Sequence, residues 1–492
     1  MDLDNYNHIS FYKTVHDIKQ YFPENNKQKF GAVFTSYHFI DTMFTFIDEK
    51  YFKNKHLKWC DMGCGLGYFT IYLYFKLMEH LVTIENITER CRHIIENMLY
   101  MIDIQEEYIP FLKKIFGENA NIYCRDFLDW EPTIKFDFII GNPPFHSNHI
   151  KQVPTNKEKK EIFTNSETIW PKFIFKADTL LQDNGRLLVV IPSLWCKFDS
   201  YGIYNYLIKR LEKVRLYNNT EINKLFHYQA QTPCSILLSR KKENEDQNKD
   251  QNKDQNENKT ETSISSFLIY DCFRKDYIDF NIYFEKQSIP IKFPLLFKKM
   301  NKYCLKYGNM RKYCFRSKMP SIKVKLQDEI TDNYKYKNIH STILNKKTDI
   351  SEPLIVCKYS NISCSYYRIP KIVLAHKMYG FPYYDVSGNF GISNRDNYVI
   401  IDLTDDEFKL MVSFTSSILF IFILECFKYR MKMIEHCFVE YFPNITKMKI
   451  NFSNNIENID EFWFDVFDVS VQERDHICNH FSKKYLRIPR FE

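Results

Sequence analysis

The feature that most constrains the fold is a glycine-rich turn between a predicted strand and a predicted helix. His56–Cys60 is typical of a strand, Asp61–Gly67 carries glycines at alternate positions, and Tyr68–Leu73 begins an apolar helix. Glycines let a ligand approach the backbone closely, and a helix N-terminus favours negative groups. Glycines at a tight strand–helix turn also occur without any ligand. The turn by itself therefore predicts an α/β sheet with a candidate binding loop.

Acidic residues follow two further predicted strands. Leu81–Ile84 ends in Glu85, about 20 residues after the turn, where an acid can hold two ribose hydroxyls. Asn121–Cys124 leads to Asp126 and Phe127, where a carboxylate and an aromatic ring can meet an adenine. Each acid is also compatible with a helix cap or a solvated strand end. Their order at successive strand ends favours a ligand site.

A fourth predicted strand, Phe136–Ile140, ends in Gly141 and the tetrapeptide Asn142-Pro143-Pro144-Phe145. The two prolines hold the backbone rigid and remove two N–H donors. They present the Asn142 amide oxygen and a backbone carbonyl as acceptors beside an aromatic ring. Such a corner can hold a planar amino group such as that of adenine, and the alternative is a tight turn that only ends the strand. Its place in the series favours the amino-group site.

These segments resemble the motifs of a known family. Asp61–Gly67 resembles motif I of S-adenosylmethionine-dependent methyltransferases, and Asn142–Phe145 resembles their (D/N/S)PP(Y/F) catalytic motif. Phe30–Ser36 resembles motif X of the gamma-class DNA adenine-N6 methyltransferases, with Ser36 where proline is usual. Phe145 replaces the commoner tyrosine. Ile169–Phe173 and Gly185–Pro192 are similar to the next helix and strand, and the resemblance is closest to the TaqI-like restriction–modification branch.

The resemblance implies S-adenosyl-L-methionine as cofactor and assigns residues to it. Thr35 would contact the methionine carboxylate, and Asp61 with Gly63 would border the methionine moiety. Gly65 and Gly67 complete the same loop, Glu85 would hold the ribose, and Asp126 and Phe127 would contact the cofactor adenine. Asn142 and the Pro143 carbonyl would accept the two N6 hydrogens of a flipped adenine, with Pro144 fixing the corner and Phe145 stacking on the base.

The expected fold class is α/β, a Rossmann-like class I methyltransferase sheet followed by a C-terminal α+β target-recognition domain. A length of 492 residues favours more than one domain. The polar low-complexity stretch within Lys241–Thr262 has nothing to bury and is predicted to be a solvated linker. We predict an extension at 1–24, a catalytic domain at 25–242, a linker at 243–262 and a recognition domain at 263–492. Ile369–Leu374 and Tyr384–Ser393 are similar to the branch's specificity segment.

The charge balance suits a polyanionic partner. A net charge of +7 and a pI near 8.5 are modestly basic. Two basic clusters are candidate DNA contacts, and plain solvated surfaces are the alternative for both. The clusters are Lys151, Lys157, Lys159 and Lys160, and then Arg311, Lys312, Arg316, Lys318, Lys323 and Lys325, which are interleaved with Tyr313 and Phe315.

Other features favour an intracellular location in the cytoplasm or nucleoid. Met1–His16 shows no secretion signal, and the apolar run Leu410–Leu424 falls short of the roughly 20 residues of a membrane span, so we predict a buried helix. The 14 cysteines lack a regular framework, which fits reduced thiols. His476, Cys478 and His480 lack ligand pairs at zinc-finger spacing, so no metal site is predicted.

Together these observations predict a site-specific, adenine-specific DNA methyltransferase that modifies N6 of a flipped adenine in double-stranded DNA. We expect a monomer that methylates only, with any cognate restriction endonuclease on a separate chain and no membrane partner. The alternative is an RNA base methyltransferase, acting on adenine-N6 or guanine-N2, or a protein-glutamine methyltransferase. A third alternative is an inactive cofactor-binding module, against which the intact Asp61, Gly63, Gly65 and Asn142 argue.

Overall fold

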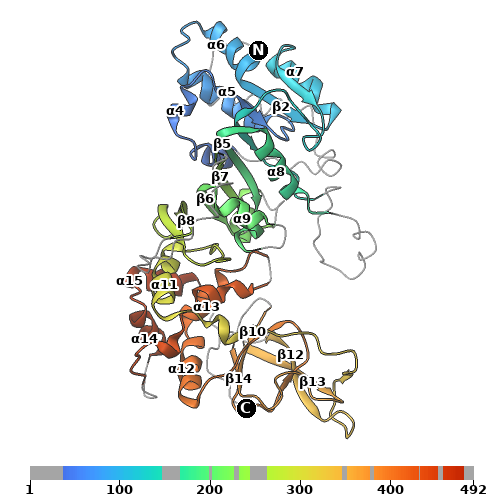
Figure 1. Ribbon diagram of the computed structural model, residues 1–492, viewed down its shortest axis with the longest axis vertical. Coiled ribbons are helices and arrows are strands. Elements are labelled where there is room, and N and C mark those ends of the chain that lie inside the picture. The colour runs from blue at the N-terminus through green and yellow to red at the C-terminus, as the bar shows by residue number, and fades with distance from the viewer. Residues whose placement is uncertain are drawn as a thin grey trace, which may run out of the picture. The chain divides into compact units, whose positions relative to one another are not determined.

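The chain forms two compact units (Figure 1). A computed structural model describes residues 37–146, 167–198, 202–226, 232–243, 263–345, 352–376, 382–430, 433–452 and 458–480. The first unit runs to Ile269, except for Cys196–Phe198, which group with the second unit; the second unit continues from Tyr270. The predicted boundary after residue 262 lies ahead of this division. The predicted extension at 1–24 lies outside the described residues.

A mostly parallel sheet forms the centre of the first unit. Its strands follow the order β3-β2-β1-β4-β5-β7-β6-β8. Neighbours from β3 to β5 are parallel, β7 is antiparallel to both β5 and β6, and β8 returns parallel to β6. The bounds are β1 (Trp59–Asp61), β2 (Leu99–Asp103), β3 (Asn121–Cys124), β4 (Phe136–Gly141), β5 (Leu181–Pro192), β6 (Leu211–Tyr217), β7 (Cys234–Arg240) and β8 (Ser265–Asp271).

Helices cover this sheet because its central strands are apolar on both faces. Phe138, Ile139 and Ile140 of β4 are at most 1% exposed, and the Phe138 ring stacks on Trp59 of β1 at 4.1 Å. The α/β sheet expected from the sequence is confirmed. The helices of this unit are α3 (Tyr37–Phe44), α4 (Glu49–Phe52), α5 (Tyr68–His80), α6 (Ile87–His93), α7 (Ile109–Phe116), α8 (Trp170–Leu180), α9 (Ile203–Ile208) and α10 (Asn219–Leu225).

The predicted strand Leu81–Ile84 is wrong. Leu81 is the C-cap residue of α5. Its N–H donates to the Leu77 carbonyl at 2.9 Å, and its side chain is fully buried. A turn follows, with Val82 62% exposed, and the chain then forms α6 and the π-helical stretch Ile94–Met98. The second strand of the sheet is therefore β2, which ends in Asp103 rather than Glu85.

The second unit combines antiparallel sheets with helices. Its two four-stranded sheets have the orders β10-β17-β14-β15 and β11-β13-β12-β16. Its strands are β9 (Asp276–Ile282), β10 (Cys314–Arg316), β11 (Leu326–Gln327), β12 (Tyr336–Asn345), β13 (Glu352–Ser360), β14 (Lys371–Ala375), β15 (Pro382–Asp385), β16 (Gly391–Ile392) and β17 (Asn397–Ile400). Its helices are α11 (Pro294–Tyr307), α12 (Asp405–Thr415), α13 (Ile418–Glu425), α14 (Ile459–Val466) and α15 (Val471–His480). This mixture is the α+β content expected from the sequence.

The apolar run Leu410–Leu424 is buried, as predicted, but it forms two helices rather than one. Helices α12 and α13 meet at an angle of 69°. The break falls at Ser416 and Ser417, because the Ser417 side chain caps α13 by accepting from the Phe420 N–H at 3.2 Å. Within the described ranges no single helix could cross a membrane, although this bent pair together has the length and apolar character to do so.

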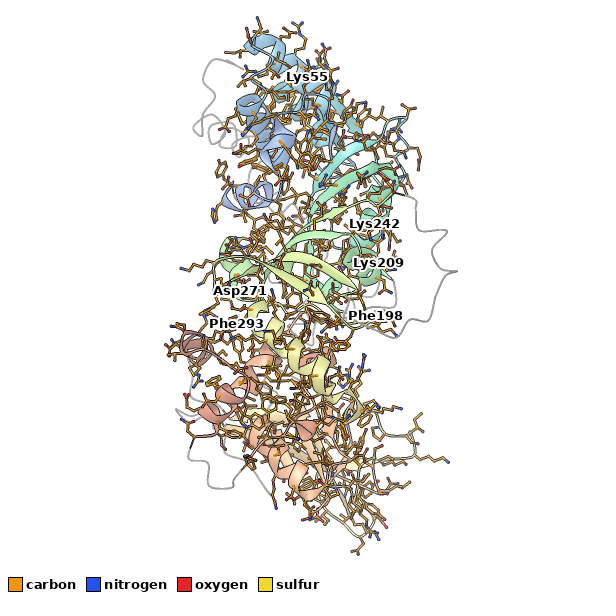
Figure 2. The ribbon with its side chains drawn as sticks, turned by 60° about the vertical axis from the view of Figure 1, so that its left-hand side comes forward. Lys55, Phe198, Lys209, Lys242, Asp271 and Phe293 are labelled. Atoms are coloured by element: carbon orange, nitrogen blue, oxygen red, sulfur yellow. The ribbon has the colours of Figure 1, made fainter. Side chains whose placement is uncertain are left out.

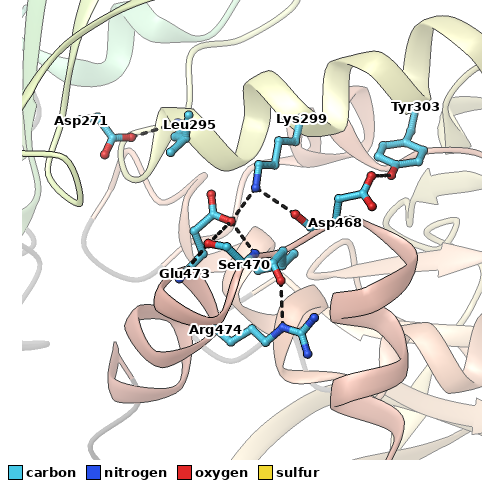
Figure 3. Close-up of polar contacts among 9 residues, drawn as sticks. Asp271, Leu295, Lys299, Tyr303, Asp468, Ser470, Glu473 and Arg474 are labelled. Carbon is cyan, nitrogen blue, oxygen red and sulfur yellow. Dashed lines mark hydrogen bonds and ion pairs between the residues drawn. The ribbon is translucent and has the colours of Figure 1, made fainter.

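Polar contacts fasten α11 to the last two helices (Figure 3). Lys299 Nζ pairs with Glu473 Oε2 at 2.5 Å and donates to the Asp468 carbonyl at 2.9 Å. The Tyr303 hydroxyl donates to Asp468 Oδ2 at 2.6 Å. These bonds reach the N-terminal turn of α15 and the loop ahead of it, so they attach α11 to this segment.

The start of α11 is anchored separately. Asp271 Oδ2 accepts from the Leu295 N–H in the first turn at 2.9 Å, which satisfies one of the free donors of a helix N-terminus. Phe293, which is labelled in Figure 2, lies immediately before the helix. It is fully buried against the rings of Phe422 and His476. The helical part of the second unit therefore has its own apolar core.

Candidate cofactor and amino-group site

The candidate site lies where the strand order of the first unit reverses. Strands β1, β2, β3 and β4 are parallel, so their carboxyl ends share one edge of the sheet, and the order turns back between β1 and β4. Open α/β sheets bind ligands at this position. The structure brings four polar side chains to that edge, one from the end of each strand: Asp61, Asp103, Asp126 and Asn142.

Backbone hydrogen bonds hold the glycine-rich loop against the neighbouring strands. The Met62 N–H donates to the Ile140 carbonyl of β4 at 3.0 Å, and the Cys64 N–H donates to the Ile102 carbonyl of β2 at 3.0 Å. A Cβ atom at Gly63 or Gly65 would meet no atom within 4 Å. Open space therefore lies against the loop backbone, where a ligand can approach it.

Gly67 has a different role from the other two glycines of the loop. It precedes α5 with a φ of 81°, and a Cβ atom there would lie 2.8 Å from Leu112 Cδ2 of α7. The absence of a side chain therefore lets α5 pack closely on α7. This contact favours a packing role for Gly67 over the cofactor contact predicted from the sequence.

Asp61 is a buried carboxylate with one unsatisfied oxygen. Its Oδ2 accepts from Thr70 Oγ1 at 2.8 Å, whereas its Oδ1 has no hydrogen-bond partner among the described residues. Burial raises the pKa of Asp61 to about 7, against the lowering effect of the Thr70 hydrogen bond. An unpaired buried oxygen is costly unless a ligand supplies a donor. The ammonium group of a methionine moiety is such a donor, so the site fits the expected cofactor.

Asp103 is the acidic residue that sequence reasoning missed. Its Oδ2 accepts from the Gly65 N–H at 2.8 Å, and its Oδ1 accepts from the Gln105 N–H at 2.9 Å. It therefore ties the glycine-rich loop to the end of β2, beside Ile104, an apolar side chain that is 61% exposed. Glu85 is exposed in the turn ahead of α6 and does not lie at a strand end. The apolar run Leu99–Ile102 was the available signal.

Asp126 and Phe127 follow β3 as predicted. Asp126 Oδ1 accepts from the Leu128 N–H at 2.9 Å. Phe127 is 3% exposed, and its ring lies parallel to that of Phe173 in α8, with centroids 5.7 Å apart. The sequence placed Phe173 only within the next helix, so its pairing with Phe127 is new. The two rings form an aromatic wall beside the carboxyl end of β3.

The Asn142–Phe145 corner lies directly beside Asp61. Gly141 has a φ of 151°, and a Cβ atom there would lie 3.1 Å from Met62 Cγ and 3.4 Å from Asp61 Oδ1. This residue must therefore be glycine for the corner to approach the loop. The Asn142 side chain is half-buried and makes no hydrogen bond with any described residue. Its amide remains available to a substrate.

The corner is also anchored on its downstream side. The Phe145 carbonyl accepts from the Ile169 N–H at 3.2 Å, and His146 pairs with Thr168 in an isolated β-bridge. Burial lowers the pKa of His146 and so favours its neutral form. These contacts hold the corner at the start of α8.

Some predicted residues lie outside the described part of the chain. Thr35 and all other residues of Phe30–Ser36 are among them, because the described part of the chain begins at Tyr37. The lysines of the loop after the corner, Lys151, Lys157, Lys159 and Lys160, are also outside it. Within the described ranges, no group of three or more His, Cys, Asp or Glu side chains is arranged to hold a metal ion.

Comparison with known proteins finds a family model that matches part of the chain, including most of this site. Residues 68–234 match the Eco57I restriction-modification methylase family. The matched segment begins at α5, directly after the glycine-rich loop, and includes the ends of β2, β3 and β4 with the Asn142–Phe145 corner. It ends within β7, so it covers most of the central sheet.

Curated relatives also match part of the chain. The type II methyltransferase M.AccI of Acinetobacter calcoaceticus is 31% identical over 197 residues, which are 37% of this chain and 32% of that protein. The tRNA1(Val) (adenine(37)-N6)-methyltransferase of Flavobacterium johnsoniae is 27% identical over 134 residues, 27% of this chain and 51% of that one. The chain spans between 25% and 51% of the length of the first curated relatives that it matches.

A solved structure matches over a longer range. The crystal structure of the type IIG restriction endonuclease BpuSI aligns with 94% of this chain and 66% of its own, with 9% identity and a TM-score of 0.40.

Proposed function

We propose that the chain is a DNA methyltransferase that transfers a methyl group from S-adenosyl-L-methionine to N6 of adenine. The observation that carries this proposal is the contact between the two halves of the site. The Asn142–Phe145 corner approaches the glycine-rich loop at Gly141. Among the described residues, neither the Asn142 amide nor Asp61 Oδ1 has a hydrogen-bond partner. An amino-group acceptor and a candidate cofactor loop thus share one edge of the sheet.

The proposed cofactor contacts follow the strand ends. Asp61 Oδ1 accepts from the methionine ammonium, and the open backbone at Gly63 and Gly65 borders the same moiety. Asp103 takes the ribose hydroxyls in place of Glu85, because Asp103 ends β2 beside the loop. When bound, the cofactor supplies a methyl group on a sulfonium centre.

The adenine end of the cofactor is proposed to lie near the end of β3. Asp126 accepts from its amino group, and the aromatic wall of Phe127 and Phe173 borders its ring. Ile104, exposed next to Asp103, offers an apolar contact from the other side.

The proposed chemistry is the activation of a weak nucleophile. The lone pair of an aromatic amino group is delocalised into its ring, so the nitrogen must be drawn toward tetrahedral geometry. The Asn142 amide oxygen and the Pro143 carbonyl accept hydrogen bonds from the two N6–H groups, and the rigid Pro143-Pro144 backbone helps to fix both acceptors. Alignment and preorganised acceptors then supply most of the rate. Phe145 stacks on the base, which must be flipped out of a duplex to reach the corner.

Double-stranded DNA is the proposed substrate. The supporting observations are the match to a restriction-modification methylase family and the identity to a type II methyltransferase. The order of motif X, motif I and the corner, followed by a second unit, is that of the gamma class and its TaqI-like branch. We assign target recognition to residues 263–492, and a cognate endonuclease, where one exists, to a separate chain.

A second candidate is an RNA adenine-N6 methyltransferase. It rests on the 27% identity to a tRNA (adenine-N6)-methyltransferase, which the chain covers to 51%. DNA is favoured because the family model that matches residues 68–234 is a restriction-modification methylase family and because M.AccI is 31% identical over a longer stretch of 197 residues.

The test is expression of the chain in a host without N6-adenine methylation, followed by single-molecule mapping of N6-methyladenine. The expected result is a modified sequence motif in the host DNA, which disappears with Asn142→Ala. Purified Asn142→Ala should still bind S-adenosyl-L-methionine with wild-type affinity by calorimetry, because the residue contacts the substrate rather than the cofactor. Unmodified DNA together with methyl transfer to RNA or protein would refute the DNA proposal.

A further inference from the structure

The segment Ser317–Lys325 of the second unit, called here the basic finger, connects the edges of two sheets. It leaves β10, the edge strand of the sheet β10-β17-β14-β15, and enters β11, the edge strand of the sheet β11-β13-β12-β16. β10 pairs with β17 and β11 pairs with β13, both antiparallel. The finger is therefore held by a paired strand at each end.

Hydrogen bonds fix the base of the finger. Ser317 is 3% exposed, and its hydroxyl donates to the Asn394 carbonyl at 2.6 Å. At the other end Asn361 Oδ1 accepts from the Lys325 N–H at 2.9 Å, and the Val324 N–H donates to the Ser321 carbonyl at 2.9 Å. The projecting residues thus stand on an ordered turn.

The tip of the finger is apolar and exposed. Met319 is 59% exposed and Ile322 is 99% exposed. Single exposed apolar side chains are ordinary on protein surfaces. Two exposed apolar side chains on one hydrogen-bonded turn, with lysines on both sides, are a less common arrangement than a single exposed apolar side chain.

The cations of the finger have no carboxylate partner in the part of the chain that the structure describes. Lys318, Lys323 and Lys325 are exposed, and none pairs with a described carboxylate. Residues 311–325 contain no Asp or Glu. The first carboxylate after the finger, Asp328, pairs with Lys358 Nζ at 2.8 Å. An apolar tip therefore lies within a stretch of positive charge.

We propose that the basic finger enters a groove of duplex DNA. Its lysines contact phosphates, and Met319 with Ile322 forms an apolar wedge against the base steps. Proteins that bend DNA use this combination, because a wedge unstacks a step while cations neutralise the backbone. The inference rests on the proposed function, since it takes DNA as the substrate. Two side chains offer less apolar area than a stable membrane anchor needs, which favours DNA over an anionic membrane.

The lysines are tested by the salt dependence of binding. The full chain is titrated into a labelled duplex of mixed sequence at several salt concentrations, and fluorescence anisotropy gives the affinity. Lys323→Ala with Lys325→Ala should reduce the slope of log K against log salt by about 1.8, since each phosphate contact contributes about 0.9. Lys302→Ala with Lys306→Ala, which removes two exposed lysines of α11, is the charge-matched control. An unchanged slope in the double variant would overturn the proposal.

The tip is tested by binding and bending. Met319→Ser with Ile322→Ser should weaken duplex affinity roughly tenfold or more at an unchanged salt slope, because apolar burial is lost and charge is not. Energy transfer between dyes at the duplex ends should show a smaller bend. Val471→Ser, at a side chain that is 66% exposed, is the matched control. Wild-type affinity and bending in the tip variant would contradict the wedge.

Two further measurements separate the outcomes. Vesicles of phosphatidylserine and phosphatidylcholine are assayed by co-sedimentation: capture that depends on the tip, with duplex binding unaffected, would reassign the finger to a membrane. Finger-dependent duplex binding without any N6-methyladenine would refute the methyltransferase proposal and leave the finger standing. Methylation by a tip variant that keeps wild-type duplex affinity would refute the finger alone.

Discussion

Replacing Asp103 by alanine should weaken binding of S-adenosyl-L-methionine far more than replacing Glu85. In the proposed complex the Asp103 carboxylate accepts from the ribose hydroxyls, and a hydrogen bond to a charged group contributes about 1.5–3 kcal/mol. Loss of two such bonds at the lower value, about 3 kcal/mol, raises the dissociation constant roughly 150-fold. Glu85 is exposed in a turn, so Glu85→Ala should change the constant less than about twofold.

Isothermal titration calorimetry on the full chain measures both constants, and a control must separate binding from folding. Asp103 also accepts two backbone N–H bonds, so its loss destabilises the loop. Asp137→Ala removes a comparable bond, from the Lys58 N–H to Asp137 Oδ2 at 2.7 Å, at the amino end of β4. This variant should lose stability and keep its cofactor affinity. Wild-type affinity in Asp103→Ala, or an equal loss in Glu85→Ala, would refute the reasoning.

Three further predictions concern buried groups. Burial raises the pKa of Asp61 from its usual 3.8 to about 7, so the folded state keeps a proton that the unfolded chain releases. The free energy of unfolding of the cofactor-free protein should therefore fall by up to about 4 kcal/mol between pH 4 and 7. In denaturant titrations, Asp61→Asn should remove this pH dependence. Gly141→Ala, which forces a side chain into a φ of 151° against Met62, should cost about 1–3 kcal/mol and reduce methylation more than cofactor affinity; an unchanged melting temperature would contradict it. Lys371→Met leaves the fully buried Asp385 without its ion-pair partner and should cost about 3–5 kcal/mol in chemical unfolding, whereas a near-neutral effect would show that Asp385 is held by other donors.

The sequence correctly predicts the strand ends of the site where the local pattern of apolar and turn residues agrees with the tertiary structure. β3 and β4 occur where short apolar runs end in polar or turn residues. β4 is buried along almost its whole length, as central parallel strands are, whereas β3 is an edge strand and only partly buried. The Pro143-Pro144 pair allowed the end of β4 to be placed at Gly141. The strand before the glycine-rich turn is also present, and Asp61 proves to be its last residue.

The wrong predictions arose where a local sequence pattern is compatible with both a strand and a helix. Leu81–Ile84 has strand-like composition, but Leu81 completes the buried face of α5. A π-helical stretch before β2 has no sequence signature, so the distance from the glycine-rich turn to the second acid was underestimated. The unsatisfied Asp61 oxygen and the Phe127–Phe173 pair depend on contacts between distant segments, which one sequence does not encode locally.

The order of the last strands in the first unit has a practical consequence. β7 and β8 pair with opposite edges of β6, so the polar low-complexity stretch connects two strands of one sheet. A break in the chain between Arg240 and Ser265 would leave both fragments attached through backbone pairing rather than separate the units. The stretch is therefore a suitable place to divide the gene into two coexpressed pieces, whose reassembly would make the proposed methylation conditional on the presence of both.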